Sequence, residues 1–357
     1  MTTVSVPTPT TGAPRRYVVA DLGGTTLRIG GTAEGTDRVE AVRRMATEGL
    51  DRHRGLSTQD LQDRVVEQLT RELEAYLAGP EGAGASAVGV SFAGPMTKDG
   101  TVLAGPTLWG GPAAPLPITD ILNRRLAVPV VVANDITAAA WRYASAEPDP
   151  FCLITISSGI GHKVFRKGEV LIADSGHGGE IGHWRVDPRA DAVLCECGGR
   201  GHLGGIASGR GVLAAARRAA AADPEGFSRS ALATSAHRSP DGITNEDLAR
   251  AVRADDAFAT RVLRDCLLPL AMAVNCVFTA IGVRRYLFIG GFALAVGPRF
   301  ISLLGDELSR LGCFGLGEEE IRAMLALGAA DDDHCLLGMA RMLAEMLPAA
   351  AGSGGEV

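Results

Sequence analysis

The chain carries one strand–turn–strand pattern twice, and this repetition constrains its fold more than any other feature. The apolar run Tyr17–Asp21 (YVVAD) leads into the turn LGGTT and then into the stretch LRIGGT. The run Phe151–Ile156 (FCLITI) leads into SSGIG and then into HKVFRKG. Short apolar runs that end at glycines are typical of strands. Because such internal similarity indicates a duplicated unit, we expect two related lobes.

Helical patterns alternate with the predicted strands. Between Ser57 and Leu77, apolar residues recur every four positions along one helix face, and Gly79-Pro80 ends the pattern. Further strands are expected over 87–92, 129–133 and 286–289, and helices over 206–222, 244–254, 258–281, 298–311 and 334–346. This alternation predicts an α/β fold of two lobes, with a ligand site in the cleft between them.

Length, charge and hydropathy narrow the class of protein. The 357 residues fit two domains at about 150 residues each. A net charge of −6 argues against nucleic-acid binding over the whole surface, although a local basic patch stays open. The N-terminal segment has no apolar signal core, and the longest apolar run, Leu267–Val283, is expected to be a buried helix. We therefore expect a cytoplasmic protein without nucleic-acid or membrane partners, and its seven cysteines fit reduced thiols.

Both glycine-bearing turns have the composition of a phosphate-binding loop. Glycines let backbone amides approach an anion, hydroxyls donate to phosphate oxygens, and Arg28 adds a bidentate cation. Asp21 could hold a magnesium ion or its water. The alternative is an ordinary glycine hairpin with a surface arginine. The candidate nucleotide-binding residues are Asp21, Gly23, Gly24, Thr25 and Arg28 in the first turn and Ser158, Gly159 and Gly161 in the second.

Asn134 and Asp135 follow an apolar strand, where α/β proteins place ligands. A carboxylate at this point could accept the proton of a substrate hydroxyl as the oxygen attacks a phosphoryl group. The alternative is that Asp135 only caps the helix that begins at Ile136.

Four metal ligands lie within twenty residues of one another: His183, Cys195, Cys197 and His202. Two thiolates and two imidazoles suit a closed, structural zinc site. Two free thiols in a glycine-rich loop are the alternative, and His162 and His177 could compete as ligands. Glu180, three residues before His183, could hydrogen-bond a polyol.

Taken together, these motifs resemble the ROK family of sugar kinases and related repressors. The resemblance covers residues 17–346 and rests on the order DLGGTTLR, VGVSFAGP, VVVANDITAAA, SSGIG, GGEIGHWRV, CECGGRGH and LFIGGFA. It implies an actin-like, ribonuclease-H-like ATPase fold, use of ATP and magnesium, a structural zinc, and a homodimer.

The resemblance also implies roles for individual residues. Asp135 matches the catalytic base of the family, and Asn134 matches its sugar-contacting neighbour. The two glycine turns match the phosphate motifs. The other implied positions are Gly94, Glu180 and His183 for the substrate, with His183 also in the zinc site, and Gly290 and Gly291 for the adenosine.

Departures from the family pattern gather at the substrate positions. The third zinc cysteine is His202, and the glutamate that ends the family zinc motif is Gly204. The usual second turn GTGIGGG is SSGIGHK, whose Lys163 either adds a charge near phosphate or points to solvent. These changes suggest a sugar-like substrate other than glucose. With these changes the chain resembles the C7-cyclitol kinases of aminocyclitol biosynthesis. Those kinases phosphorylate the 7-hydroxyl of a valiolone-type ring, which has no anomeric centre.

The predicted organisation has a small lobe over 17–134, joined by a C-terminal helix over 334–347. A large lobe over 135–333 holds the zinc loop 183–202, and loose tails cover 1–16 and 348–357. One alternative function is that of a glucokinase or another hexose kinase of the same family. A sugar-binding protein without catalysis is a second. A sugar-responsive repressor is a third, for which the 20 residues before Asp21 are too few to form a helix-turn-helix domain.

Overall fold

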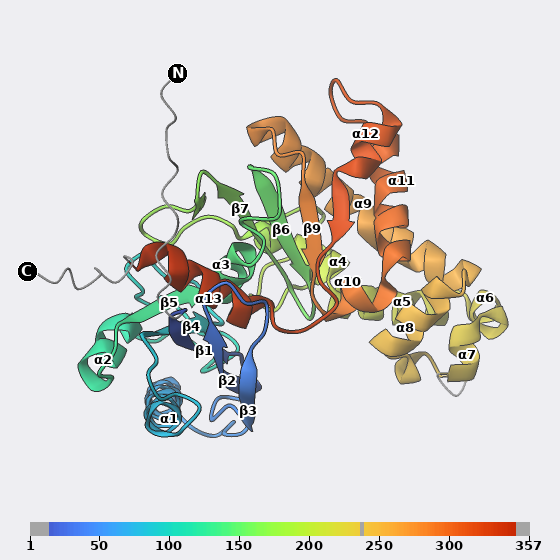
Figure 1. Ribbon diagram of the computed structural model, residues 1–357. Helices are drawn as coiled ribbons and strands as arrows, with labels where there is room; N and C mark the ends of the chain where they lie inside the picture. Colours follow the sequence, from blue (N-terminus) through green and yellow to red (C-terminus); the bar gives the residue numbers. More distant parts are fainter. Residues whose placement is uncertain (1–13, 236–238, 348–357) are drawn as a thin grey trace, which may run out of the picture. The chain divides into compact units, whose positions relative to one another are not determined.

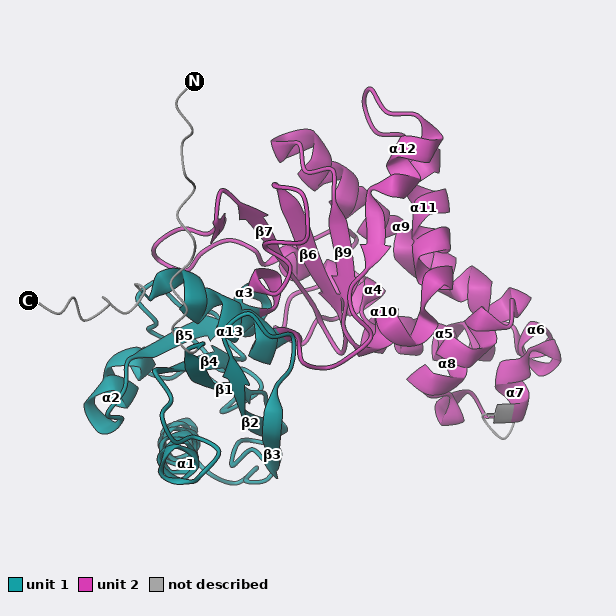
Figure 2. Cartoon of the chain, viewed as in Figure 1, with its two compact units in different colours: residues 1–138, 335–357 teal, residues 139–334 magenta. Residues whose placement is uncertain are grey.

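The computed structural model describes residues 14–235 and 239–347, so most of both expected tails lies outside the described residues. The first strand begins at Arg16, inside the expected N-terminal tail, because Arg15 is held by an ion pair with Glu34. By its contacts the chain divides into two units (Figure 2). Unit 1 comprises Met1–Ala138 and Cys335–Val357, and unit 2 comprises Ala139–His334.

Unit 1 is built on a mixed five-stranded sheet of order β3-β2-β1-β4-β5 (Figure 1). Strands β1 and β2 form an antiparallel hairpin, whereas β4 and β5 run parallel to β1. The elements are β1 (Arg16–Leu22), β2 (Thr26–Ala33), β3 (Glu40–Ala46), α1 (Thr58–Ala78), β4 (Ala87–Phe92), α2 (Ile118–Arg125), β5 (Val130–Asn134), α3 (Asp135–Trp141) and α13 (His334–Met346).

The sheet of unit 1 is covered on both faces, as the alternation of side chains along β1 shows. Val18 and Ala20 pack into the cluster that includes α1 and α2, whereas Tyr17 and Val19 pack against α13. Successive side chains of a strand point to opposite faces. The C-terminal helix, distant in sequence, is therefore an integral layer of unit 1.

Unit 2 repeats the same topology, with the order β10-β9-β6-β7-β8. Strands β6 and β7 form the hairpin, β8 extends it, and β9 and β10 run parallel to β6 and to each other. The structure thus confirms the internal repetition expected from the sequence. The elements are β6 (Phe151–Ile156), β7 (Ile160–Arg166), β8 (Glu169–Val170), η1 (Ile181–His183), α4 (Leu203–Ala207), α5 (Gly209–Ala222), α6 (Pro224–Arg229), α7 (Ala231–Ser235), η2 (Pro240–Gly242), α8 (Asn245–Arg253), α9 (Ala257–Ile281), β9 (Tyr286–Ile289), α10 (Gly291–Val296), α11 (Pro298–Leu311), α12 (Glu318–Ala323) and β10 (Leu325–Leu327).

One helical expectation needs correction, and another is supported by the core of unit 2. The helix expected over 206–222 is broken into α4 and α5 at Ser208, whose backbone is extended and whose side chain accepts a hydrogen bond from the Gly211 amide. Helix α9, which contains most of the apolar run expected to be a buried helix, could cross a membrane by its length and composition alone. Half of its most apolar window is buried, and Leu263, Leu267 and Leu270 lie in the core of unit 2. Its apolarity is therefore accounted for by the core it helps to form.

Candidate functional site

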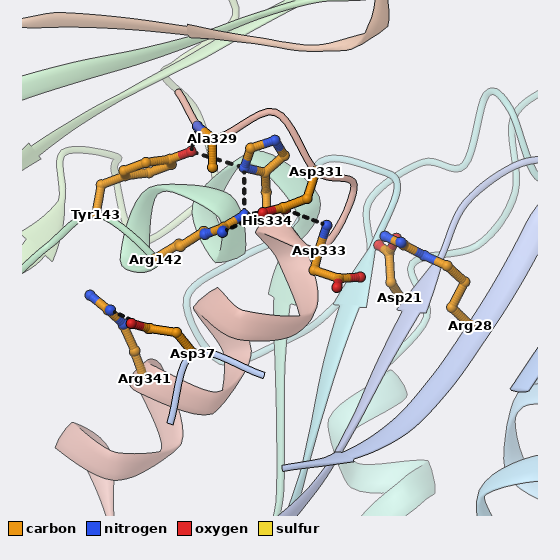
Figure 3. Close-up of polar contacts among 10 residues, drawn as sticks. All are labelled: Asp21, Arg28, Asp37, Arg142, Tyr143, Ala329, Asp331, Asp333, His334 and Arg341. Atoms are coloured by element: carbon orange, nitrogen blue, oxygen red, sulfur yellow. Dashed lines mark hydrogen bonds and ion pairs between the residues drawn. The ribbon is translucent and has the colours of Figure 1, made fainter. Parts of the chain in front are cut away.

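Asp21 is held between two neighbouring strands of unit 1. It lies opposite Arg28 in the β1–β2 register, and an Arg28 guanidinium nitrogen donates to Asp21 Oδ2 at 2.7 Å (Figure 3). Ser91, on β4, donates its hydroxyl hydrogen to Asp21 Oδ1 at 2.8 Å. Arg28 is only 7% exposed, so the alternative of a surface arginine is wrong. Since a carboxylate offers about four lone-pair positions, Asp21 retains acceptor capacity for a cation or its water.

The first glycine turn is tied to its surroundings through its backbone. The Gly23 amide donates to Thr26 O, and Thr47 donates from its hydroxyl to Gly23 O and from its amide to Thr25 O. A Cβ atom at Gly24 would lie 2.7 Å from the carbonyl oxygen of Thr107. The turn therefore needs glycine at position 24 because another backbone segment passes there.

Asn134 and Asp135 meet where β5 ends and α3 begins. Asn134 Oδ1 accepts from the amides of Ile136 at 3.1 Å and Thr137 at 3.2 Å, which are helix-capping bonds. Asn134 Nδ2 donates to Gly94 O at 3.0 Å and to Asp135 Oδ1 at 2.8 Å. Asn134 thus performs much of the capping that the alternative assigned to Asp135, although Asp135 Oδ1 also accepts from the Ile136 amide at 2.9 Å.

Sequence reasoning missed Cys335, which lies beside the predicted base. Its thiol donates to the backbone oxygen of Asp135 at 3.4 Å. Burial, followed by the negative charges of Asp21 and Asp135, raises the pKa of this thiol well above its usual range. The two residues are 200 positions apart in sequence, so no local pattern could have joined them.

The second glycine turn is more open than the first. A Cβ atom at Gly159 would meet nothing within 4 Å, and Ser158 is exposed. Gly161 follows on β7, opposite Thr155. Arg210, near the start of α5, donates to Ser158 O at 2.8 and 3.1 Å and also forms an ion pair with Glu196. Arg210 thereby connects the second turn to the loop that carries the two cysteines.

Lys163 does not point to solvent, so that alternative for its side chain is wrong. It is only 4% exposed, and its ammonium donates to Gly178 O at 3.1 Å. The same nitrogen lies 3.4 Å from Glu180 Oε1. The candidate substrate carboxylate therefore has a buried cation beside it.

His162 fastens the same loop and is not drawn into the candidate metal cluster. Its Nδ1 accepts from the Ile181 amide at 3.2 Å, and its own amide donates to Gly179 O at 3.4 Å. Burial, helped by the charge of Lys163, lowers the pKa of His162 to about 4. The ring is therefore neutral at pH 7, as an acceptor of an amide hydrogen must be.

The four expected metal ligands converge in unit 2. One ligand atom from each of His183, Cys195, Cys197 and His202 lies within 4.8 Å of all the others. Cys197 Sγ is 3.2 Å from His202 Nδ1, and the two imidazole rings are 5.7 Å apart and nearly perpendicular. Zinc bonds of about 2.0–2.3 Å place tetrahedral ligand atoms about 3.3–3.8 Å apart. The donor set and its spacing therefore fit zinc after a contraction of about one ångström.

Backbone turns bring these ligands together. The Cys195 amide donates to Gly199 O at 2.7 Å, and the Gly198 amide donates back to Cys195 O at 2.9 Å. At Gly201, φ is +70° and a Cβ atom would lie 1.9 Å from Asp187 O, so only glycine fits. Gly198, Gly199 and Gly201 thus form the turns of the loop that carries the metal ligands.

The two glycines of the expected adenosine motif differ in what they require. Gly290 caps α10 with a φ of +93°, and a Cβ atom there would lie 2.7 Å from Ile156 O and Thr155 Oγ1. A Cβ atom at Gly291 would meet nothing within 4 Å. Position 290 therefore needs glycine for the backbone, whereas position 291 leaves open space.

A further polar cluster in unit 2 ties two distant segments together (Figure 3). Arg142 pairs with Asp331, which lowers the pKa of that carboxyl to about 2 through the hydrogen bond. Tyr143 and Arg142 both lie within hydrogen-bonding distance of His334 Nδ1. Tyr143 also accepts from the amide of Ala329 at 2.9 Å. The cluster joins the two ends of unit 2 in sequence.

Two units of one repeated topology, each with a strand–turn–strand hairpin at its centre, define an actin-like ATPase fold of two lobes. The ROK family model matches residues 25–341, and the chain belongs to the ROK family.

Curated relatives of high identity are kinases. Two proteins named C(7)-cyclitol 7-kinase come from Streptomyces hygroscopicus, subspecies jinggangensis and limoneus. The first is 65% identical, covering 94% of this chain and 96% of that protein. The second is 64% identical, covering 95% and 97%. An N-acetylmannosamine kinase of Shigella boydii is 37% identical but covers only 42% of this chain and 52% of that protein.

Solved structures agree with the fold. A ROK glucokinase from Streptomyces griseus, in complex with glucose and AMPPNP, has a TM-score of 0.70 at 24% identity, covering 92% of this chain and 98% of that chain. A ROK transcriptional regulator, a homologue of the Escherichia coli MLC protein, has a TM-score of 0.71 at 20% identity, covering 92% and 78%. Kinases and a regulator share this fold, so the fold alone does not decide between them.

Proposed function

We propose that this ROK kinase is a C(7)-cyclitol 7-kinase, which transfers the γ-phosphoryl group of ATP to the 7-hydroxyl of a valiolone-type cyclitol. The observation that carries the proposal is the 65% identity to a protein of that name over almost the whole of both chains. The substitutions at the substrate positions are consistent with it, because Gly204 removes a carboxylate expected near an anomeric hydroxyl. A cyclitol has no anomeric centre and therefore no anomeric hydroxyl. The absence of that carboxylate thus leaves no substrate hydroxyl without a hydrogen-bond acceptor at this position.

Asp135 is the proposed catalytic base. It accepts the proton of the 7-hydroxyl while the hydroxyl oxygen forms a bond to the γ-phosphorus and the bond from that phosphorus to the bridging oxygen of ADP breaks. Asn134 orients this carboxylate, since its Nδ2 donates to Asp135 Oδ1 and is itself anchored on Gly94 O. The family resemblance implies a sugar contact for Asn134. Both of its amide hydrogens already have acceptors within the chain, which favours orientation over contact.

The nucleotide is proposed to bind through the two glycine turns and Gly290-Gly291. A bound magnesium ion would neutralise charge on the phosphates as it develops, and Asp21 is the residue proposed to hold the ion or its water. Arg28 and Ser91 keep the Asp21 carboxylate at one position. Gly23, Gly24, Thr25, Ser158, Gly159 and Gly161 are proposed to present backbone amides or hydroxyls to phosphate oxygens.

The cyclitol hydroxyls are proposed to be recognised by Glu180 and His183. Glu180 is about half exposed, and its backbone oxygen accepts from the His183 amide at 2.9 Å, so the two side chains are fixed on one turn. The zinc that His183, Cys195, Cys197 and His202 would hold is proposed to be structural, because four protein ligands close a tetrahedral site. Zinc would then fix the loop that presents His183.

We further propose a cytoplasmic homodimer that does not act on nucleic acid or membranes. The second copy is proposed to cover an open apolar hollow of about 480 Å³ on unit 2, lined by residues of α9 together with Trp184 and Leu311. Met272 and Leu311 are 41% and 40% exposed there, which is unusual for large apolar side chains of a monomer that gather in one place. Light scattering of the wild type and of Met272→Asp tests this, since a dimer held by this hollow would dissociate in the variant.

A substrate panel tests the proposed activity. ATP with valiolone-type cyclitols, glucose, mannose or N-acetylmannosamine should give a phosphorylated product only, or far faster, with the cyclitols, and NMR should place the phosphate on the 7-oxygen. Equal or faster turnover of glucose would instead make the protein a hexose kinase. Tight binding of a polyol without ATP-dependent phosphorylation would make it a binding protein.

A further inference from the structure

Lys163 occupies an exceptional environment for its charge. Among the described residues, Arg28 and Lys163 are the only lysine or arginine side chains that are buried. Each lies on the second strand of the hairpin in its unit, and each pairs with one carboxylate. Burial of an ammonium group costs free energy unless the group is paired and hydrogen-bonded. The partners of Lys163 therefore stabilise its charge at this buried position.

The loop before Glu180 wraps around the Lys163 ammonium. Gly178 O accepts from it at 3.1 Å, and a Cβ atom at Gly179 would lie 2.5 Å from Nζ. Gly178 and Gly179 both have positive φ values, +116° and +77°, and such backbone has many alternative conformations when nothing holds it. Lys163 therefore holds in place a glycine-containing segment whose backbone would otherwise have several accessible conformations.

The same contact sets the position of the Glu180 side chain. Lys163 Nζ lies 3.4 Å from Glu180 Oε1, which leaves Oε2 for other donors. The backbone oxygen of Glu180 accepts a hydrogen bond from the His183 amide, so the position of Glu180 also affects that of His183. His162, the neighbour of Lys163, holds the adjacent Ile181 amide, so two consecutive residues of β7 anchor the turn.

We propose that Lys163 is a positioning residue that orients Glu180 toward an uncharged polyol and so contributes to the choice of substrate. This inference rests on the proposed function for the role of Glu180. Lys163 attracts one carboxylate oxygen, and the other accepts a hydrogen bond from a ring hydroxyl. In this role Lys163 acts through Glu180 and not by its own contact with the substrate.

Steady-state kinetics of Lys163→Met test the proposal, with Lys167→Met as the control because Lys167 is exposed on the following turn. Lys163→Met should raise KM for the cyclitol about tenfold or more and change KM for ATP by less than about twofold. In a Glu180→Gln background the same replacement should change KM for the cyclitol by less than about threefold, because its effect passes through Glu180. Additive effects, or an equal rise of KM for ATP, would overturn the proposal.

Hydrogen exchange gives a readout that does not depend on activity. Amides of 178–183 should exchange faster in Lys163→Met than in the wild type, and those in Lys167→Met should not. If Lys163→Met fails to fold, Lys163→Gln, which retains a donor for Gly178 O without the charge, takes its place in the kinetic experiment. Unchanged exchange overturns the positioning role even if the wild type phosphorylates a cyclitol. Faster exchange in a wild type that phosphorylates no cyclitol supports positioning and rejects only the proposed function.

Discussion

The central hairpins of the two units have the same register but carry their charges at different places. In unit 1 the second pair from the turn is Asp21 and Arg28, and in unit 2 the equivalent pair is Thr155 and Gly161. Two positions further along the second strand, unit 1 has a glycine, Gly30, where unit 2 has Lys163.

The difference indicates that the same hairpin topology can support two kinds of site. In unit 1 the buried cation faces a carboxylate of the neighbouring strand, which suits a site for a cation and phosphates. In unit 2 the buried cation reaches a loop outside the sheet and holds Glu180 there. We therefore expect damage to the unit 1 hairpin to affect phosphoryl transfer and damage to the unit 2 hairpin to affect substrate choice.

Replacement of the proposed base should have the largest effect. Asp135→Asn should lower kcat by about a thousandfold, within the range for loss of a general base, while cyclitol binding persists. Calorimetry for binding and a coupled assay for kcat measure this, with Asp51→Asn as an exposed control. Full activity of Asp135→Asn would show that Asp135 is not the catalytic base.

Loss of the metal should destabilise unit 2 more than unit 1. Cys195→Ser should lower the zinc content from about one ion per chain to near zero and reduce the thermal midpoint by several degrees, since structural zinc contributes to folding. Metal analysis and calorimetry check this, with His177→Asn as control because His177 is an exposed histidine outside the cluster. A wild type that folds stably without zinc would contradict the structural role.

Arg28→Met sharpens the comparison of the two buried cations. Without its partner Asp21 loses its fixed position, and we expect kcat/KM for ATP to fall about tenfold to a hundredfold with KM for the cyclitol little changed. This is the reverse of the pattern expected for Lys163→Met. Arg44→Met, on the exposed neighbour of Arg28 in β3, is the control. The same kinetic pattern in Arg28→Met and Lys163→Met would break the comparison.

The last prediction concerns His162, whose effect on stability appears only in acid. Its pKa is lowered to about 4 in the folded chain, so the folded state favours the neutral ring. The unfolded chain binds a proton near pH 6.5, so this stability is complete above pH 6.5 and is lost as the pH falls toward 4, by up to about 3 kcal/mol. His162→Gln should flatten the decline of the unfolding free energy over that range, measured by denaturant titration. An unchanged slope would show that the ring is already charged in the folded state.

Much of the fold could be predicted because its elements have strong local patterns. The strands 87–92 and 151–156, the helix that follows Ser57 and the helix expected over 244–254 lie where the sequence places them. Strand β3 escaped prediction because it is an edge strand whose residues include Glu40, Arg43 and Arg44, are mostly exposed and do not alternate between apolar and polar. Strand β10 has only three residues, too few for a period.

The candidate site was predictable wherever its members stand close together in sequence. The metal ligands all lie between 183 and 202, and the spacing of cysteine and histidine alone indicated a cluster. The surroundings of Lys163 were not predictable, because its partners are contributed by a loop 15 and 17 residues away whose path depends on glycines with positive φ. Cys335 was missed for the same reason over a longer distance.

The sequence by itself determined the duplicated α/β units and the residues available for chemistry, because short-range hydrophobic periods and turn composition specify these. The resemblance to the ROK family came from the order of its motifs along the chain. Only the tertiary structure decided which charges are paired. Whether Arg28 and Lys163 are solvated or buried depends on strands and loops that meet through folding, and burial removes the water that would otherwise satisfy them. As a result, the buried Arg28 of the first hairpin pairs with Asp21, and the buried Lys163 of the second hairpin pairs with Glu180.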